Sequence, residues 1–315
     1  MIFKHILFPV DFLVQTRAVE RDVEWLARRF GSRVTLLHAA QAPYGWSDVR
    51  GTAEFSGQTA GLFDCAAKEN LPDCRIDVAE DRLTRIVARG RTARDIADQA
   101  NEDDIDLVVM GTDGCGIAKR LLFGSILEEV LHEVPCPIWT RAARESDSLH
   151  NLDVTNILCL LEISEEAFPL LQFAKQIADA FGARISLLHS DPGAKPSKAT
   201  RSGVVQYEDV QVGDGILSLQ RQAGTDFSVF LTTEPVQEAV RHMALDRKAD
   251  LVLIGRGTGH HWFTAGASGV IRHSPCPVLS YSPRLKCESG LTEQRLRVNA
   301  PVPPVKSSDK TVDYR

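Results

Sequence analysis

Residues 105–125 of the chain read IDLVVMGTDGCGIAKRLLFGS. The first six residues form a short, largely apolar run, which is typical of a strand buried on both faces of a parallel sheet. The residues from 126 to 132 have the pattern of a helix. Glycines therefore occur where a strand ends and again where a helix begins, and in an open α/β sheet ligands bind at that end of the fold.

This glycine-rich stretch has two interpretations. Glycine lets the backbone approach a ligand closely, and a helix N-terminus offers free N–H groups that suit a phosphate. Ser125 would then donate its hydroxyl to a phosphate oxygen. The alternative is a turn in which Ser125 only caps the helix and no ligand binds. The glycine spacing is neither that of a Walker A loop nor that of GxGxxG.

Strands and helices alternate along the first half of the chain. The apolar patterns predict strands over 6–10, 33–39, 85–88, 105–110 and 136–141, and helices over 19–30, 59–70, 92–100 and 125–133. Residues 41–58 are rich in Gly, Pro and Ser and are predicted to form a long loop. This alternation predicts an α/β fold with a parallel sheet and helices on both faces.

The same pattern then repeats. At an offset of 151 residues, Gly182–His189 matches Gly31–His38, and further on residues 249–255 match 105–111. The chain therefore contains a duplicated domain rather than an array of short repeats. The predicted units are a first domain, a second domain and a disordered tail, over residues 1–142, 154–282 and 283–315.

Each repeat ends on a strand that begins with Pro-Cys-Pro, at 135–137 and at 275–277. Proline removes a donor from the strand ladder, so it belongs at strand starts and sheet edges. An edge strand in each repeat favours edge-to-edge pairing. We therefore expect the two repeats to form a pseudo-dimer within one chain.

Composition narrows the class of protein. The chain has 315 residues and a formal net charge of −6, which argues against a nucleic-acid partner. No apolar run approaches the roughly 20 residues of a membrane span, and Met1 to His5 lead directly into a strand with no signal pattern. The seven cysteines include no Cys-x-x-Cys pair. We therefore expect a cytoplasmic protein with reduced thiols and no membrane association.

The spacing within the glycine-rich stretch resembles a known signature. It is similar to the nucleotide-binding signature of the universal stress protein family. In this chain two residues separate Gly111 from Gly114, and nine residues separate Gly114 from Gly124-Ser125. The resemblance covers residues 3–141 and, more loosely, 154–281. It also involves Pro9-Val10-Asp11, Leu36–Ala39, Gly90–Ala93 and Val134–Ile138. It implies two repeated doubly wound, Rossmann-like domains with five-stranded parallel sheets, paired through their last strands.

The resemblance also implies which residues bind the ligand. In members that bind ATP, the aspartate after the first strand and the backbone ending the second strand hold the adenosine, which here means Asp11 and Ala39. The glycines and the serine of the signature hold the phosphates. The implied site is Pro9, Val10, Asp11, Ala39, Met110, Gly111, Gly114, Gly124, Ser125 and Ile126, and the implied cofactor is ATP with Mg²⁺. One departure is Leu13, where the family often has a serine.

The second repeat departs further from the signature. Glu162 stands where the first repeat has Asp11, and the loop over 255–268 is two residues shorter and ends in Gly266-Ala267. We expect this repeat to bind ATP weakly or not at all. Arg256 in this loop has two interpretations, a phosphate partner or an exposed, solvated side chain.

Histidines and catalytic motifs add little to this prediction. His38 and His189 end equivalent strands, for which packing is favoured over lining a pocket. His260-His261 has no carboxylate or cysteine at metal-ligand spacing and is interpreted as part of a polar loop, with no metal. The sequence contains no HExxH and no G-x-S-x-G.

The predicted function is that of an ATP-binding universal stress protein with a regulatory or protective role and little or no turnover. Its predicted partners are an adenine nucleotide and a regulatory protein. The alternatives are a slow ATPase and a scaffold that binds no nucleotide. Beyond the pseudo-dimer within the chain, a homodimer of two chains is a further option.

Overall fold

The structure is a computed structural model of the chain. It describes residues 2–10, 17–40, 76–89, 92–102, 104–112, 126–142, 153–164, 166–193, 210–256 and 267–283. The predicted loop over 41–58, the predicted helix over 59–70 and the predicted tail from residue 284 onward lie outside these residues.

The strands of both repeats form one sheet. The first repeat contributes β1 (His5–Pro9), β2 (Arg33–Ala40), β3 (Leu83–Arg89), β4 (Leu107–Gly111) and β5 (Ile138–Arg141). The second contributes β6 (Asn156–Leu160), β7 (Arg184–Ser190), β8 (Ser228–Thr232), β9 (Leu251–Gly255) and β10 (Val278–Tyr281). The sheet has ten strands in the order β3-β2-β1-β4-β5-β10-β9-β6-β7-β8.

Within each repeat the neighbouring strands are parallel. The strand order reverses between β1 and β4, and again between β6 and β9, so each repeat is doubly wound. The repeats meet where β5 pairs antiparallel with β10 and Trp139 lies opposite Leu279. This topology confirms the predicted α/β pseudo-dimer of two five-stranded parallel halves.

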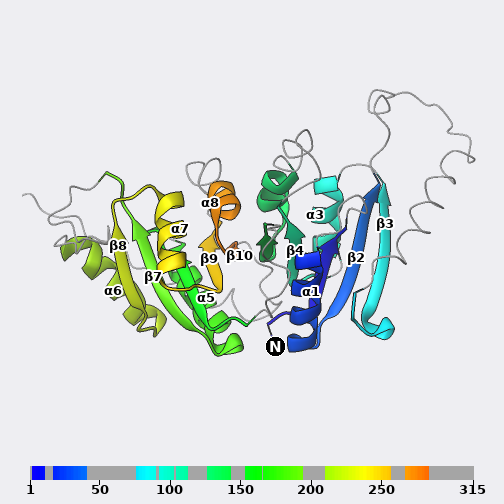
Figure 1. Ribbon diagram of the computed structural model, residues 1–315, viewed down its shortest axis with the longest axis horizontal. Coiled ribbons are helices and arrows are strands. Elements are labelled where there is room, and N and C mark those ends of the chain that lie inside the picture. The colour runs from blue at the N-terminus through cyan, green and yellow to red at the C-terminus, as the bar shows by residue number, and fades with distance from the viewer. Residues whose placement is uncertain are drawn as a thin grey trace, which may run out of the picture. The chain divides into compact units, whose positions relative to one another are not determined.

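Helices cover both faces of the sheet (Figure 1). The described helical segments are α1 (Arg17–Phe30), the 3-10 turn η2 (Glu80–Arg82), α3 (Thr92–Glu102), a helix over 126–133, α5 (Ala167–Phe181), α6 (Val210–Ala223), α7 (Val236–Asp246) and α8 (Ala267–His273). Residues of α1, α5 and α6 join one hydrophobic cluster, and residues of α3, the 126–133 helix, α7 and α8 join the other.

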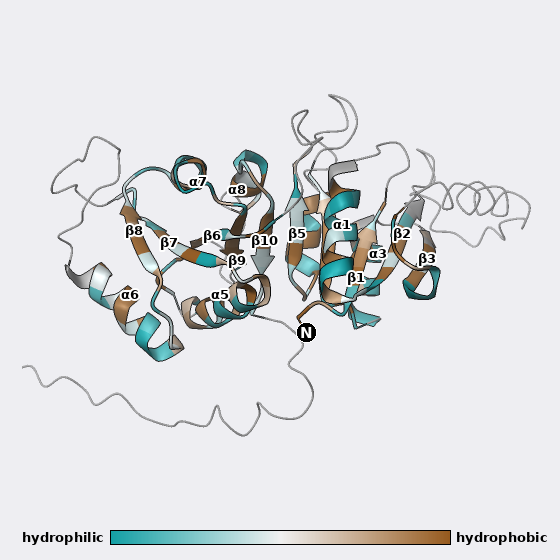
Figure 2. Cartoon of the chain, turned by 60° about the horizontal axis from the view of Figure 1, so that its bottom comes forward, coloured by the Kyte–Doolittle hydropathy of each residue, from teal (hydrophilic) through white to brown (hydrophobic). Residues whose placement is uncertain are grey.

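The strands are apolar because both of their faces are buried. In β1, Ile6 and Phe8 point into one cluster and Leu7 points into the other, and all three are nearly inaccessible to solvent. Figure 2 shows the contrast with α1, where apolar and polar colours alternate along one helix. This arrangement explains why the strand signal is a continuous apolar run and the helix signal is periodic.

The two repeats end their first helices in the same way. Gly31 follows α1 with φ +64°, and Gly182 follows α5 with φ +69°. Both values lie in the left-handed region that glycine adopts without strain, which is the usual end of a helix. The Ser32 N–H then donates to the carbonyl of Ala27 at 3.0 Å. The match between repeats in the sequence is therefore a match in backbone geometry.

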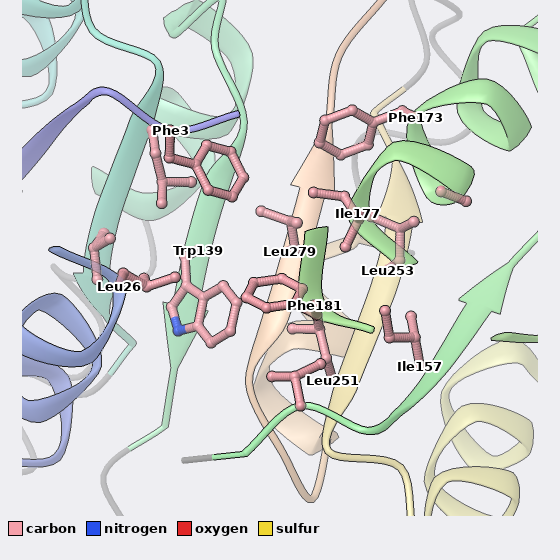
Figure 3. Packing of buried hydrophobic residues seen from close by; sticks show 14 of the residues in the cluster. Phe3, Leu26, Trp139, Ile157, Phe173, Ile177, Phe181, Leu251, Leu253 and Leu279 are labelled. Atoms are coloured by element: carbon pink, nitrogen blue, oxygen red, sulfur yellow. The ribbon is translucent and has the colours of Figure 1, made fainter. Parts of the chain in front are cut away.

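A buried polar contact joins α1 to β5, the strand that pairs with β10. Asp22 of α1 is 1% exposed, and its carboxylate accepts a hydrogen bond of 2.8 Å from the indole N–H of Trp139. Arg141 of β5 forms an ion pair of 2.9 Å with the same carboxylate. Figure 3 shows the Trp139 ring in one apolar cluster with Phe181 and Leu279 of the second repeat.

The second repeat replaces this polar contact with an aromatic stack. Phe173 occupies the position in α5 that Asp22 occupies in α1, and Tyr281 occupies the position in β10 that Arg141 occupies in β5. The two rings stack with their centroids 4.4 Å apart. The duplicated halves therefore share a backbone but use different chemistry at equivalent positions.

Contacts between α1 and α5 also join the repeats. Trp25 stacks on Phe181 with 5.4 Å between the ring centroids. The Arg29 guanidinium donates to the carbonyl oxygens of Ala180 and Phe181, at 2.9 and 3.1 Å. These carbonyls end α5, where a cation is favourable because the helix dipole is negative there.

Candidate functional site

The carboxyl ends of three neighbouring strands define the candidate site in the first repeat. β1 lies between β2 and β4, with Pro9 paired to Leu37 and Leu7 paired to Val108. The strand order reverses between β1 and β4, and ligands of open α/β sheets bind outside such a switch point. Gly111 ends β4 at this edge, paired to Arg141.

Two hydrogen bonds fix the backbone of Val10 just beyond β1. The Val10 N–H donates to the carbonyl of Leu37 at 2.8 Å. Nδ1 of His38 lies 3.1 Å from the carbonyl oxygen of Val10. Because a carbonyl oxygen only accepts, Nδ1 of His38 carries the proton in this contact. Val10 is therefore held from β2 through both its N–H and its C=O, immediately before Asp11.

The second repeat reproduces this arrangement. The Leu161 N–H donates to Leu188 at 2.8 Å, and Nδ1 of His189 donates to the carbonyl of Leu161 at 2.9 Å. The sequence favoured a packing role for both histidines over lining a pocket. The structure adds a specific hydrogen bond, which sequence reasoning missed although the repetition of His at two strand ends was its signal.

The structure places six of the ten predicted site residues. Pro9 and Val10 lie at the end of β1, Ala39 lies in β2, and Met110 and Gly111 end β4. The sixth, Ile126, is the first described residue of the helix that runs to residue 133. The Met110 side chain is buried in the cluster that contains α3, so its backbone is the part that faces the edge of the sheet. Asp11, Gly114, Gly124 and Ser125 lie outside the described residues.

Thr112 continues the edge immediately after Gly111. Its N–H donates to the carbonyl of Arg141 at 3.0 Å, which extends the pairing of β4 with β5. Its hydroxyl oxygen is buried and has no hydrogen-bond partner among the described residues. The backbone at the start of the glycine-rich loop is therefore anchored on the side of β5.

The equivalent edge of the second repeat is acidic. Glu162 follows β6 at the position of Asp11, and its pKa is raised by partial burial and by the negative charge of Glu166. Asp191 follows β7, and Glu234 lies beyond β8, where its carbonyl accepts the Ser190 hydroxyl at 2.6 Å. Carboxylates at this edge repel a triphosphate electrostatically.

Arg256 corrects both interpretations made from the sequence. Its side chain is neither exposed nor directed to a ligand in the second repeat: the residue is 2% exposed. Its guanidinium donates to the carbonyls of Leu131 and Val134 at 2.7 and 3.1 Å, and to that of Cys136 at 2.6 Å. All three acceptors belong to the first repeat. Burial lowers the pKa of Arg256 to about 10, so the side chain remains a cation at neutral pH.

Three cysteines within the described ranges, Cys136, Cys159 and Cys276, form no disulfide. Burial raises the pKa of both Cys136 and Cys159 to about 12. These two side chains are therefore neutral and unreactive at physiological pH, and they pack as small apolar groups. Cys115 lies outside the described residues.

In the part of the chain that the structure describes, no three His, Cys, Asp or Glu side chains come together as metal ligands. His260-His261 lies beyond that part. No helix within the described ranges has both the length and the apolar character needed to span a membrane.

Comparisons with known proteins agree with this fold. The model of the universal stress protein family matches residues 2–140 and again residues 154–281. A Thermus aquaticus protein named "Universal stress protein in QAH/OAS sulfhydrylase 3'region" is 27% identical over 144 residues, which are 44% of this chain and 97% of that protein.

Solved structures of similar fold include a universal stress protein from Archaeoglobus fulgidus. It matches with a TM-score of 0.62 and 18% identity, over 88% of this chain and 96% of that chain. Another is the universal stress protein from Archaeoglobus fulgidus in complex with dAMP, with a TM-score of 0.31 and 19% identity, over 41% of this chain and 98% of that chain.

Proposed function

Because the chain belongs to the universal stress protein family, with one match to the family in each repeat, we propose that its first repeat binds ATP. The nucleotide binds at the carboxyl ends of β1, β2 and β4. Binding, rather than turnover, is its activity. The observation that carries the proposal is the position of Gly111, which opens the signature loop at the switch point of the sheet.

Each part of the nucleotide meets suitable groups in this proposal. The Asp11 carboxylate accepts hydrogen bonds from the adenosine, and the backbone of Ala39 lies alongside it. The glycines at 111, 114 and 124 expose backbone N–H groups to the phosphates, and Ser125 adds a hydroxyl. Mg²⁺ binds with the phosphates, whose charge it neutralises. The fixed backbone of Val10 supports the site because it sets where Asp11 begins.

A binding role without turnover fits the chemistry at this edge. The side chains described beyond the ends of β1 and β4 are those of Val10 and Thr112, and neither is an acid–base group. We therefore propose that a nucleotide is bound there with little or no turnover. Its presence or absence then changes the affinity of the protein for a regulatory partner in the cytoplasm, which is the regulatory or protective role we propose.

We further propose that ATP binds once per chain. The edge of the second repeat carries Glu162 with Glu166 beside it, where the charge opposes a triphosphate. Arg256, the cation nearest in sequence to Gly255, donates to the first repeat instead. The charges described at this edge of the second repeat therefore do not favour a triphosphate.

The experiment is a calorimetric titration of the full chain with ATP in the presence of Mg²⁺. Saturable binding near one ATP per chain is the expected result. No binding would refute the nucleotide and favour the scaffold, and two equal sites would refute the assignment of the second repeat. Hydrolysis at a rate comparable with ordinary enzymes, measured as phosphate release, would contradict a binding role.

A further inference from the structure

Arg256 is buried in a contact between the two repeats that has no equivalent in the opposite direction. It follows Gly255, the last residue of β9, and in the first repeat the corresponding residue after Gly111 is Thr112. Thr112 is too short to reach across, and its hydroxyl has no partner in the part of the chain that the structure describes. The contact therefore runs in one direction, from the second repeat to the first.

Of the three acceptors of Arg256, Leu131 lies in the last turn of the helix over 126–133, Val134 directly follows the helix, and Cys136 lies in the segment that leads into β5. The last carbonyls of a helix have no partner within the helix, and they lie at the negative end of its dipole. The planar guanidinium donates to Leu131 and Val134 through one nitrogen and to Cys136 through the other. Arginine suits this task because its donors are fixed in one plane.

Within the described residues, Arg256 has no anionic partner. None of the ion pairs of the described residues includes Arg256. Burial raises the pKa of the adjacent Cys136 thiol to about 12, so this group is neutral. A buried charge is costly unless hydrogen bonds compensate it, so the three carbonyls and the helix dipole carry the stabilisation of Arg256.

In the second repeat, the carbonyl equivalent to that of Cys136 belongs to Cys276, and it accepts a hydrogen bond from a residue of the same repeat. The hydroxyl of Ser274 donates to the carbonyl of Cys276 at 2.8 Å, whereas in the first repeat the position of Ser274 is Val134, which has no such hydroxyl. The carbonyl of Cys136 therefore depends on the other repeat for its donor. Arg256 donates to the Cys136 carbonyl of the first repeat the hydrogen bond that Ser274 donates to the Cys276 carbonyl within the second repeat.

The other end of the same helix leads, in the sequence, to the proposed phosphate site. Ile126 is the first described residue of the helix, and it directly follows Gly124-Ser125 of the signature in the sequence. A helix over 126–133 is about 12 Å long, so it transmits a displacement of its last turn to its first turn as a rigid element. Fixing its carboxyl end fixes the direction of the N–H groups at its amino end.

We propose that Arg256 is a positioning residue, which from the second repeat holds the helix over 126–133 and thereby aims its amino end at the phosphates in the first repeat. This inference rests on the proposed ATP site. It gives the second repeat a role that needs no ligand of its own.

The test measures binding of ATP and of adenosine by the full chain and by two variants, Arg256→Met and Arg29→Met. Arg29 is the matched control, because it also crosses between repeats and donates to helix-ending carbonyls, but those of α5. We expect Arg256→Met to raise the Kd for ATP by roughly 2- to 30-fold and to leave the Kd for adenosine unchanged. Arg29→Met changes neither.

A general loss of structure is distinguished by the choice of ligand. If Arg256→Met weakened ATP and adenosine equally, or left ATP affinity unchanged, the positioning role would be wrong. Arg256→Lys keeps the charge at the helix end without the planar fork, so it is expected to recover part of the ATP affinity. This variant also serves if Arg256→Met does not fold.

Hydrogen exchange without nucleotide separates this inference from the proposed function. Backbone amides over 127–134 are expected to exchange faster in Arg256→Met than in the unaltered chain, and to be unaffected by Arg29→Met. Unchanged protection in Arg256→Met would overturn the positioning role even if the unaltered chain bound ATP. An unaltered chain that binds no ATP would instead refute the proposed function, and with it the link from helix to phosphates.

Discussion

Asp22 and Trp139 are joined by a hydrogen bond of 2.8 Å between a carboxylate oxygen and the indole nitrogen, although 117 residues separate them in sequence. Asp22 is 1% exposed and Trp139 is fully buried. The contact connects α1 to β5, the strand that pairs with β10 of the second repeat. The strand at the contact between the repeats is therefore held to α1 by the buried carboxylate of Asp22, which also pairs with Arg141.

Replacing Asp22 with Ala is expected to reduce the free energy of unfolding by about 3–5 kcal/mol, because it removes a buried carboxylate from two partners. The indole N–H of Trp139 is then buried without its acceptor. Asp22→Asn retains an oxygen for the indole and is expected to lose less. Urea unfolding followed by tryptophan fluorescence measures both variants.

Asp98→Ala is the matched control for this prediction. Asp98 pairs with Arg94 on the exposed side of α3, and its removal is expected to cost under about 0.5 kcal/mol. Similar losses for Asp22→Ala and Asp98→Ala would show that the buried contact contributes no more than a surface ion pair.

Changing His38 is expected to affect nucleotide binding through Val10. The amide nitrogen of asparagine lies where Nδ1 of histidine lies, whereas that of glutamine lies one bond further out. His38→Asn is therefore expected to retain ATP affinity, and His38→Gln to weaken it roughly fivefold, the equivalent of one hydrogen bond of about 1 kcal/mol. Calorimetry measures the two affinities.

His189→Gln makes the same change in the second repeat, where the same contact to Leu161 exists. It is expected to leave ATP affinity unchanged. An equal loss from both glutamine variants would place the nucleotide in both repeats, contrary to the proposal.

Gly124→Val and Gly114→Val are each expected to abolish ATP binding, because a branched side chain obstructs the approach of the phosphates to the backbone. The fold is expected to remain, as judged by circular dichroism and the unfolding temperature. Gly266→Val, in the loop of the second repeat, is the comparison that should leave ATP affinity intact. ATP affinity that survived Gly124→Val and Gly114→Val would remove the signature from the site.

The buried thiols predict a loss of stability at alkaline pH. Burial raises the pKa of Cys159 from an ordinary value of 9.0 to about 12. Above pH 9 the unfolded chain loses this proton while the folded chain retains it, so the stability is complete below about pH 9 and declines as the pH rises toward 12. Cys136 contributes in the same direction.

Urea unfolding at pH 8, 9.5 and 10.5 measures this decline, and Cys159→Ala is expected to make it shallower. At pH 8, iodoacetamide is expected to label Cys276, which is half-buried, before Cys136 and Cys159. Rapid labelling of Cys159 in the folded chain would contradict its burial.

The fold could be predicted largely from the sequence because its signals are local. The apolar runs of the strands and the repeat at an offset of 151 residues predicted two parallel halves, and the register of the β-sheet confirms them. The Pro-Cys-Pro segments predicted edge strands that pair, and β5 pairs with β10 as expected.

The two buried charges could not be predicted equally well. The burial of Asp22 could have been predicted from its position, because it lies three residues from Val19 and four from Leu26 on the apolar face of α1. Arg256 had none, because its acceptors lie 120 to 125 residues away in the sequence and on another repeat. The phosphate-binding role of Gly111, Gly114, Gly124 and Ser125 remains a prediction from the signature, and the last three of these residues lie outside the described part of the chain.

The antiparallel pairing of β5 with β10 has a consequence for how the two halves vary. In a symmetric homodimer every substitution is made twice, once on each side of the twofold axis. In a single chain each side changes alone. Two differences between the repeats illustrate this freedom. The Asp22–Arg141 ion pair of the first repeat is replaced at the equivalent positions of the second by the Phe173–Tyr281 stack. Arg256 of the second repeat has Thr112 as its equivalent in the first. Because the halves are joined in one chain, the second repeat can carry a contact, that of Arg256 with the carbonyls of the first repeat, which the first repeat does not return.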